Sequence, residues 1–229
     1  MEREKKYKSP VILTVAYDRL KRRWRRRFVL ANLFYFIIIG CLGVLILQEG
    51  KTRKFLALEG NRLEEYKTKE AIYSILRSRG VSLSQGVDIA ETTIRQSKAL
   101  DIPMSLILAV MKKESMFTPY AVSSQNAMGL MQVHPITWEE YRAKLNLNVS
   151  AQAAFDPVMN IVVATHVIRD LHEFYKKTMK SDSEVWNSVL SAYYAGRTSL
   201  SRTGITEPHL RYVADVKRFK GEFDEKFKD

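Results

Sequence analysis

The chain of 229 residues is long enough for one ordinary domain and a membrane segment, and it carries a net charge of +12. Eleven of its Lys and Arg residues and four of its acidic residues fall within residues 1–50, so this segment alone carries +7. The basic excess therefore belongs mainly to the N-terminal segment. Because the sequence contains no zinc-finger motif and no aromatic-rich basic motif, we expect no nucleic-acid partner.

The N-terminal segment has the pattern of a membrane anchor. Residues 1–27 are polar and end in a dense basic run, whereas residues 28–47 carry no charge. Twenty apolar residues in a helix span the hydrocarbon core of a bilayer. Eight basic residues lie between Lys8 and Arg27, and five follow the apolar segment up to Lys67. The positive-inside rule therefore predicts a single pass through the inner (cytoplasmic) membrane, with the N-terminus inside and the remaining chain periplasmic.

A second mode of anchoring competes with this span. Residues 38–41 read IIGC and resemble a lipobox, in which Cys41 is lipidated after a signal peptide is removed. The apolar run continues beyond Cys41, where a lipoprotein usually turns polar, and this favours the uncleaved span. Cys41 is the only cysteine in the sequence, so an intrachain disulfide is excluded.

The remaining chain divides into a linker and a helical domain. Residues 48–64 are polar and contain two glycines, so we expect a linker there. Apolar residues at helical spacing predict a mainly helical domain over residues 65–229. The predicted helices run from 65 to 80, from 84 to about 99, from 103 to 118, from 135, from 157 to about 177, from 182 or 183 to about 195, and through 209–216.

The helix expected from Pro103 carries the candidate catalytic group. Its apolar residues at positions 106, 107, 110 and 111 form one stripe, and Glu114 continues that stripe. Burial and the negative end of the helix dipole both raise the pKa of such a carboxyl group. A carboxylic acid that stays protonated near neutral pH can protonate a leaving oxygen, as glycoside cleavage requires. The alternative is a glutamate that reaches the surface or pairs with a nearby Lys or Arg.

The residues after Glu114 form a specific motif. The chain reads ESMFTPYAVS from Glu114 to Ser123, and AMGLMQV follows at residues 127–133. Later stretches read DPVMNI at 156–161, AYYAG at 192–196 and YVADV at 212–216. Together these motifs resemble the lytic transglycosylase domain of the soluble type, in the lysozyme-like superfamily. The resemblance covers roughly residues 84–220.

This resemblance implies a mainly α, lysozyme-like fold with a small β element near residues 127–134. It implies cleavage of the β-1,4 bond between N-acetylmuramic acid and N-acetylglucosamine in peptidoglycan glycan strands, with a 1,6-anhydro product. In this reaction Glu114 acts first as the acid and then as the base, and no cofactor is required. No second Asp or Glu belongs to the motif, because Asp156 is interpreted as a helix cap.

The resemblance also assigns substrate-binding roles to the loop after the acid. Ser123 would face the acetamido group or the developing charge, and Gln132 would hydrogen-bond sugar. Gly129 and Met131 would shape the wall of the cleft. The alternative for Ser123 is a hydroxyl that stabilises a turn.

Two tyrosines and two departures from the family pattern complete the expected site. Tyr193 would lie against the reacting sugar or hydrogen-bond the acid, with Tyr212 nearby, and core packing is the alternative for either ring. Asn126 stands where the family usually has Gly, and Asn is the residue that best tolerates a positive φ after Gly. Tyr194 stands at the usual Asn position, and a phenol cannot mimic an amide.

Two other functions remain open at this stage. A muramidase of the same fold would use water and leave a reducing end, and a catalytically inactive protein would only bind glycan or serve a structural role in the wall. The four histidines show no spacing typical of metal ligands, so no metal site is expected.

Overall fold

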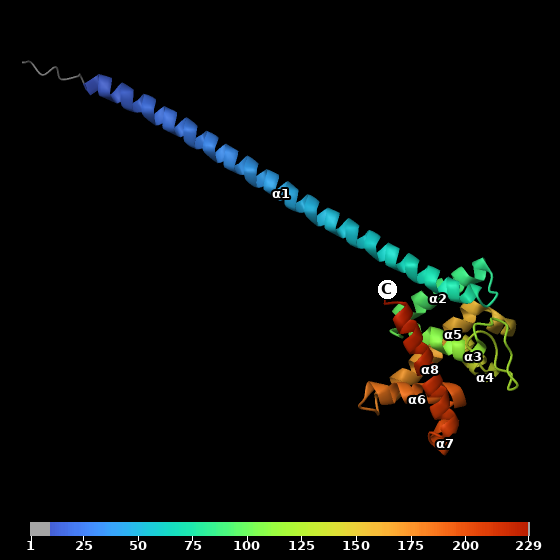
Figure 1. Ribbon diagram of the computed structural model, residues 1–229. Helices are drawn as coiled ribbons and strands as arrows, with labels where there is room; N and C mark the ends of the chain where they lie inside the picture. The colour runs from blue at the N-terminus through green and yellow to red at the C-terminus, as the bar shows by residue number, and fades with distance from the viewer. Residues whose placement is uncertain (1–9, 229) are drawn as a thin grey trace, which may run out of the picture. The chain divides into compact units, whose positions relative to one another are not determined.

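The computed structural model describes residues 10–228, and the boundary between its two compact units falls between Leu63 and Glu64. The described part of the first unit is helical and belongs to α1 (Pro10–Arg77), which is coloured blue to cyan in Figure 1. The apolar segment 28–47 lies within this helix, and its side chains are exposed. Within the described residues, α1 is the one helix with the length and apolarity to cross a membrane.

Residues 48–64, where we expected a linker, are helical in the structure. Charged pairs one turn apart stabilise this part of α1: Arg53 contacts Glu49 at 2.6 Å, and Arg62 contacts Glu59 at 3.3 Å. The segment is also rich in Leu, Lys, Arg and Glu, whose helix propensities are high. These local preferences outweigh the two glycines, each of which costs about 1 kcal/mol in a helix interior.

The second unit is built from helices, as the sequence predicts. After the end of α1 come α2 (Leu83–Leu100), α3 (Met104–Ser115), α4 (Pro135–Lys144), the short 3-10 helix η1 (Ala151–Phe155), α5 (Pro157–Lys176), α6 (Asp182–Ala195), α7 (Arg197–Thr203) and α8 (Glu207–Lys226). The β element expected near residues 127–134 consists, within the described residues, of two isolated antiparallel bridges, from Met128 to Val122 and from Met128 to Val133.

Capping residues set where two of these helices begin. The α2 helix begins after Ser82, two residues before the expected Ser84, and the Ser82 hydroxyl accepts the backbone N–H of Gln85. Asp156 caps α5 by accepting the N–H of Met159 at 2.9 Å, and a proline occupies the first helical position. Asp156 therefore has the capping role that the sequence predicts.

The core of the second unit surrounds α3. Every residue from Ser105 to Met111 is buried, so the first two turns of α3 are enclosed on all sides. The α3 helix packs most extensively on α8, while α5 packs on α2 and α6 (Figure 1). The last turn of α3, which carries Glu114, emerges from this core beside α8.

Candidate active site

Glu114 lies in the last turn of α3, and backbone geometry ends the helix directly after it. Met116 and Phe117 both adopt left-handed conformations, with φ of 52° and 65°. The Phe117 ring is buried and packs edge-to-face on Phe223 of α8, with 6.2 Å between ring centroids. Because this ring anchors the chain in the core, the turn that carries Glu114 is held in place.

The carboxyl group of Glu114 is partly buried and hydrogen-bonded. The phenol of Tyr212 on α8 donates to its Oε1 at 2.5 Å. Burial raises the pKa of Glu114 to about 7, although the Tyr212 hydrogen bond and the positive charge of Lys113 act in the opposite direction. Near neutral pH the group is therefore present in both protonation states, and it can donate or accept a proton.

Tyr193 of α6 is the second phenol beside the acid. Its hydroxyl donates to the backbone carbonyl of Met131 at 2.7 Å, so it binds the loop after the acid and not Glu114 itself. Burial, and then the negative charge of Glu114, raise the pKa of both Tyr193 and Tyr212 well above the usual tyrosine value. Both phenols therefore remain protonated donors around neutral pH.

Asn160 of α5 fastens the loop 127–133 to the domain. Its side chain is fully buried, and its Oδ1 accepts the backbone N–H of Met131 at 2.7 Å. Its Nδ2 donates to the carbonyl groups of Met128 at 2.9 Å and Ala154 at 2.8 Å. Asn160 thus supports the loop, in line with its match to the family motif.

Gly129 and Met131 contribute to this loop through the backbone. Gly129 has φ +79°, and a Cβ there would lie 2.5 Å from Nδ2 of Asn160. The Met131 side chain is fully buried, so it packs in the core and does not face an open surface. The loop is also tied to the acid's own helix, because the Ser115 hydroxyl donates to the carbonyl of Leu130 at 2.7 Å.

Ser123 and Gln132 are both engaged within the turn between α3 and α4. The Ser123 hydroxyl accepts backbone N–H groups two and four residues further on, at 3.2 and 3.0 Å, which is the turn-stabilising role. Gln132 donates through Nε2 to the carbonyl groups of Ala121 and Gly129, at 3.0 and 2.9 Å. Its Oε1 forms no hydrogen bond within the described residues. Asn126 has φ 61°, the positive value expected of a Gly substitute.

Tyr194, the departure from the family pattern, lies directly beside the acid's partner. Its ring stacks on Tyr212, with 4.9 Å between ring centroids and 25° between ring planes. Nearly half of the residue's surface, 49%, is exposed. Tyr194 therefore lies beside the Tyr212–Glu114 pair.

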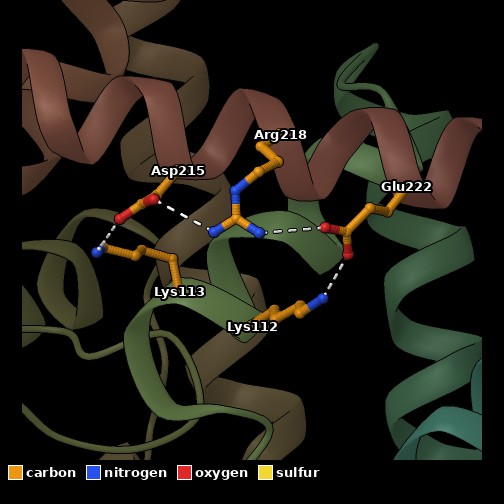
Figure 2. Close-up of polar contacts among 5 residues, drawn as sticks. All are labelled: Lys112, Lys113, Asp215, Arg218 and Glu222. Carbon is orange, nitrogen blue, oxygen red and sulfur yellow. Dashed lines mark hydrogen bonds and ion pairs between the residues drawn. The ribbon is translucent and has the colours of Figure 1, made fainter.

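Charged residues on α3 and α8 hold the acid's helix against its partner helix (Figure 2). Lys112 pairs with Glu222 at 2.5 Å and Lys113 with Asp215 at 2.6 Å, while Arg218 contacts both carboxylates at 3.3 Å. Both lysines lie off the apolar stripe of α3. Asp215, Arg218 and Glu222 are spaced at i, i+3 and i+7, so the sequence places them on one face of α8, but it does not show which helix that face meets.

These features define a class: a helical, lysozyme-like domain with one glutamic acid of raised pKa at the end of its central helix. The family described as the Transglycosylase SLT domain matches residues 91–211, more than half of the chain, and the chain belongs to this family. Within the described residues, no three His, Cys, Asp or Glu side chains form a group that could hold a metal ion.

The relatives found among curated proteins are named as membrane-bound enzymes. The membrane-bound lytic murein transglycosylase C of Salmonella arizonae is 35% identical over 113 residues, which are 48% of this chain and 31% of that protein. The protein of the same name from Klebsiella pneumoniae matches with the same identity and coverage. The match thus spans about a third of the length of these relatives.

Solved structures confirm the lysozyme-like fold. An inactive mutant of the lytic transglycosylase Slt from Pseudomonas aeruginosa has a TM-score of 0.52 at 22% identity, covering 59% of this chain and 24% of that one. The 70-kDa soluble lytic transglycosylase of Escherichia coli also has a TM-score of 0.52, at 21% identity, covering 61% and 24%.

Proposed function

We propose that this chain is a membrane-anchored peptidoglycan lytic transglycosylase with Glu114 as its catalytic residue. The observation that carries the proposal is the position of Glu114: a partly buried acid of pKa about 7 inside the family's motif. The relatives named lytic murein transglycosylases support the reaction class and the polymer substrate. The bond cleaved is the β-1,4 link between N-acetylmuramic acid and N-acetylglucosamine.

The proposed reaction uses one carboxyl group twice. Protonated Glu114 gives its proton to the glycosidic oxygen, and the substrate's own 2-acetamido group stabilises the cationic carbon. The carboxylate then accepts the proton of the C6 hydroxyl as that oxygen closes on C1, which yields the 1,6-anhydro sugar and restores the acid. A pKa near the working pH suits a group that must serve in both roles. Since Tyr212 occupies Oε1, Oε2 is the oxygen that carries the proton.

The electrostatic environment of Glu114 favours this reaction over hydrolysis. Glycosidases that use water generally need a second carboxylate to activate the water or form a covalent intermediate. The charged side chain that acts on the pKa of Glu114 is Lys113, and no carboxylate does so within the described residues. This supports the proposal that the C6 hydroxyl of the sugar, and not a water molecule, is the attacking group.

The remaining site residues have supporting roles in this proposal. Gln132 directs its Oε1 to a sugar donor, because its Nε2 is engaged in the turn. Ser123, Gly129 and Met131 shape the loop that forms the wall of the cleft. Tyr193 fixes that wall by its bond to the Met131 carbonyl and lies beside the acid.

Two observations on α1 and on the relatives support a proposed location. Its apolar segment has the length and composition of a membrane span, and the relatives are named membrane-bound. We propose that residues 28–47 cross the cytoplasmic membrane, with the basic N-terminus inside and the SLT domain on the periplasmic side. The partners are then the lipid bilayer and the glycan strands.

Mass spectrometry of the fragments released from purified peptidoglycan tests the function. The full chain in detergent should release muropeptides with anhydromuramyl ends, and Glu114→Gln should release them about 10²–10⁴-fold more slowly. Reducing muramic ends alone would instead identify a hydrolase. If the parent chain binds the polymer but releases nothing, the protein is an inactive binder.

A further inference from the structure

Tyr194 connects the acid to the surface of the domain. We propose that its ring is a stacking platform for one N-acetylated aminosugar of the glycan strand, an inference that rests on the proposed function and concerns the same site. Tyr194 stacks on Tyr212 at 4.9 Å between centroids, and Tyr212 donates to Glu114 at 2.5 Å. The three side chains, from α3, α6 and α8, thus form one continuous series from the acid outward.

The Tyr194 ring is held by two neighbours. Tyr212, on which it stacks, is itself buried, and the buried imidazole of His209 meets Tyr194 edge-to-face, with 5.8 Å between centroids and 88° between planes. His209 is fixed in turn, because the backbone N–H of Thr206 donates to its Nδ1 at 3.1 Å. A ring that is already ordered loses little conformational entropy when a ligand packs on it.

Tyr194 is also partly open to solvent. Tyr212 stacks on one face of Tyr194, yet 49% of the residue's surface stays exposed. A β-1,4-linked aminosugar carries its polar groups equatorially, so its axial C–H groups form an apolar face of about the size of a phenol ring. Tyrosine offers such a face an apolar surface, together with a hydroxyl that can hydrogen-bond a sugar hydroxyl or acetamido group.

The alternative is that Tyr194 only shields the hydrogen bond between Tyr212 and Glu114 from water. The two roles differ in what they change. A platform contributes to sugar binding, so its loss raises KM and also weakens binding to a chain that cannot cleave the glycan. A shield acts through the acid, so its loss changes kcat and the pH profile and leaves binding alone.

Binding of an N-acetylglucosamine hexasaccharide, measured by calorimetry, tests the platform. The protein is the full chain in detergent with Glu114→Gln, which prevents cleavage. Adding Tyr194→Ala should weaken binding roughly 3–10-fold, as expected for the loss of one aromatic stacking contact. Tyr194→Phe keeps the ring and should stay within about twofold of the background protein. Tyr66→Ala, which removes an exposed tyrosine of α1, is the matched control and should bind unchanged.

Several results would overturn the platform. In the Glu114→Gln background, these are unchanged binding by Tyr194→Ala, an equal loss of binding in Tyr194→Phe, or no hexasaccharide binding by the background protein itself. In the active chain, a fall in kcat with unchanged KM for Tyr194→Ala would also overturn it. The proposed function fails separately: a chain that releases no anhydro product but still binds the hexasaccharide through the Tyr194 ring lacks the activity and keeps the platform. Normal anhydro products with unchanged binding by Tyr194→Ala would remove the platform alone.

Discussion

Tyr212 donates a hydrogen bond of 2.5 Å to Oε1 of Glu114, although 98 residues separate them in the chain. This bond stabilises the charged form of the acid, whereas burial stabilises the neutral form, and burial has the larger effect. The resulting pKa of about 7 is the property on which the proposed chemistry depends.

Replacement of the acid tests its role directly. Glu114→Gln keeps the shape of the side chain and removes the proton donor, so the rate of peptidoglycan cleavage should fall by about 10²–10⁴-fold. In the parent chain, kcat/KM should decline above pH of about 7, because the protonated fraction of Glu114 then falls. Glu140→Gln, at an exposed position of α4, should behave like the parent. A Glu114→Gln chain that digests peptidoglycan at the parental rate refutes the assignment.

The two tyrosines beside the acid should have different effects. Tyr212→Phe removes a bond that lowers the pKa of Glu114, so the alkaline limb of the pH–rate profile should move to higher pH. Tyr193→Phe removes only the bond to the Met131 carbonyl, so it should leave this limb in place and cost roughly 1 kcal/mol of stability. The pH–rate profiles of both variants, measured side by side, test this difference. An equal displacement of the alkaline limb in both variants contradicts the structure.

The raised pKa of Glu114 also makes stability depend on pH. The folded chain binds the Glu114 proton more tightly than the unfolded chain, so this residue's contribution is fully present below pH 4.5 and is lost as pH rises through about 7. Glu114→Gln removes the effect and should gain up to about 3 kcal/mol more at pH 8 than at pH 4.5, relative to the parent.

Urea unfolding of the full chain in detergent at both pH values measures this difference. The exposed Glu225→Gln on α8 is the matched control and should show none. A Glu114→Gln gain that is the same at the two pH values would show that burial does not perturb this carboxyl group.

Asn160 should be essential to the loop that follows the acid. Asn160→Ala leaves the Met131 N–H and the Ala154 carbonyl without their partner and removes one of the two bonds to the Met128 carbonyl, so it should cost at least about 2 kcal/mol of unfolding free energy. Gly129→Ala should also destabilise the domain, because its Cβ would collide with the Asn160 amide at a positive φ. Thermal unfolding compares these variants with Asn148→Ala, an exposed control that should be neutral. Parental stability of Asn160→Ala would contradict the role of these bonds.

The anchor can be tested by two substitutions within α1. Ile39→Arg places a charge in the middle of the proposed span, which costs roughly 2.5–3.5 kcal/mol on insertion scales, so it should release or misplace the protein. Cys41→Ser leaves the span apolar and should remain in the membrane fraction. Loss of the Cys41→Ser protein from that fraction, or a mature N-terminus at Cys41, would identify a lipoprotein instead.

Local patterns in the sequence determined a large part of this protein. Helical spacing predicted the helices of the second unit except η1 and α7, and a proline after Asp156 predicted the cap of α5. The motif from Glu114 to Ser123 identified the family, because it combines a helix end with residue types that few other folds require at that spacing. These features depend on residues within a few turns of each other, so the sequence shows them directly.

Tertiary structure alone decided how the acid is surrounded. The first turns of α3 are buried on every side, so an apolar stripe could not indicate which helix Glu114 faces. Because α3 packs on α8, Glu114 accepts a hydrogen bond from Tyr212, while Tyr193 donates to the Met131 carbonyl. Helical periodicity describes the direction of a side chain about its own axis only. Which residue a side chain contacts depends on how two helices pack across a shared core. Contacts between residues far apart in the chain set this packing.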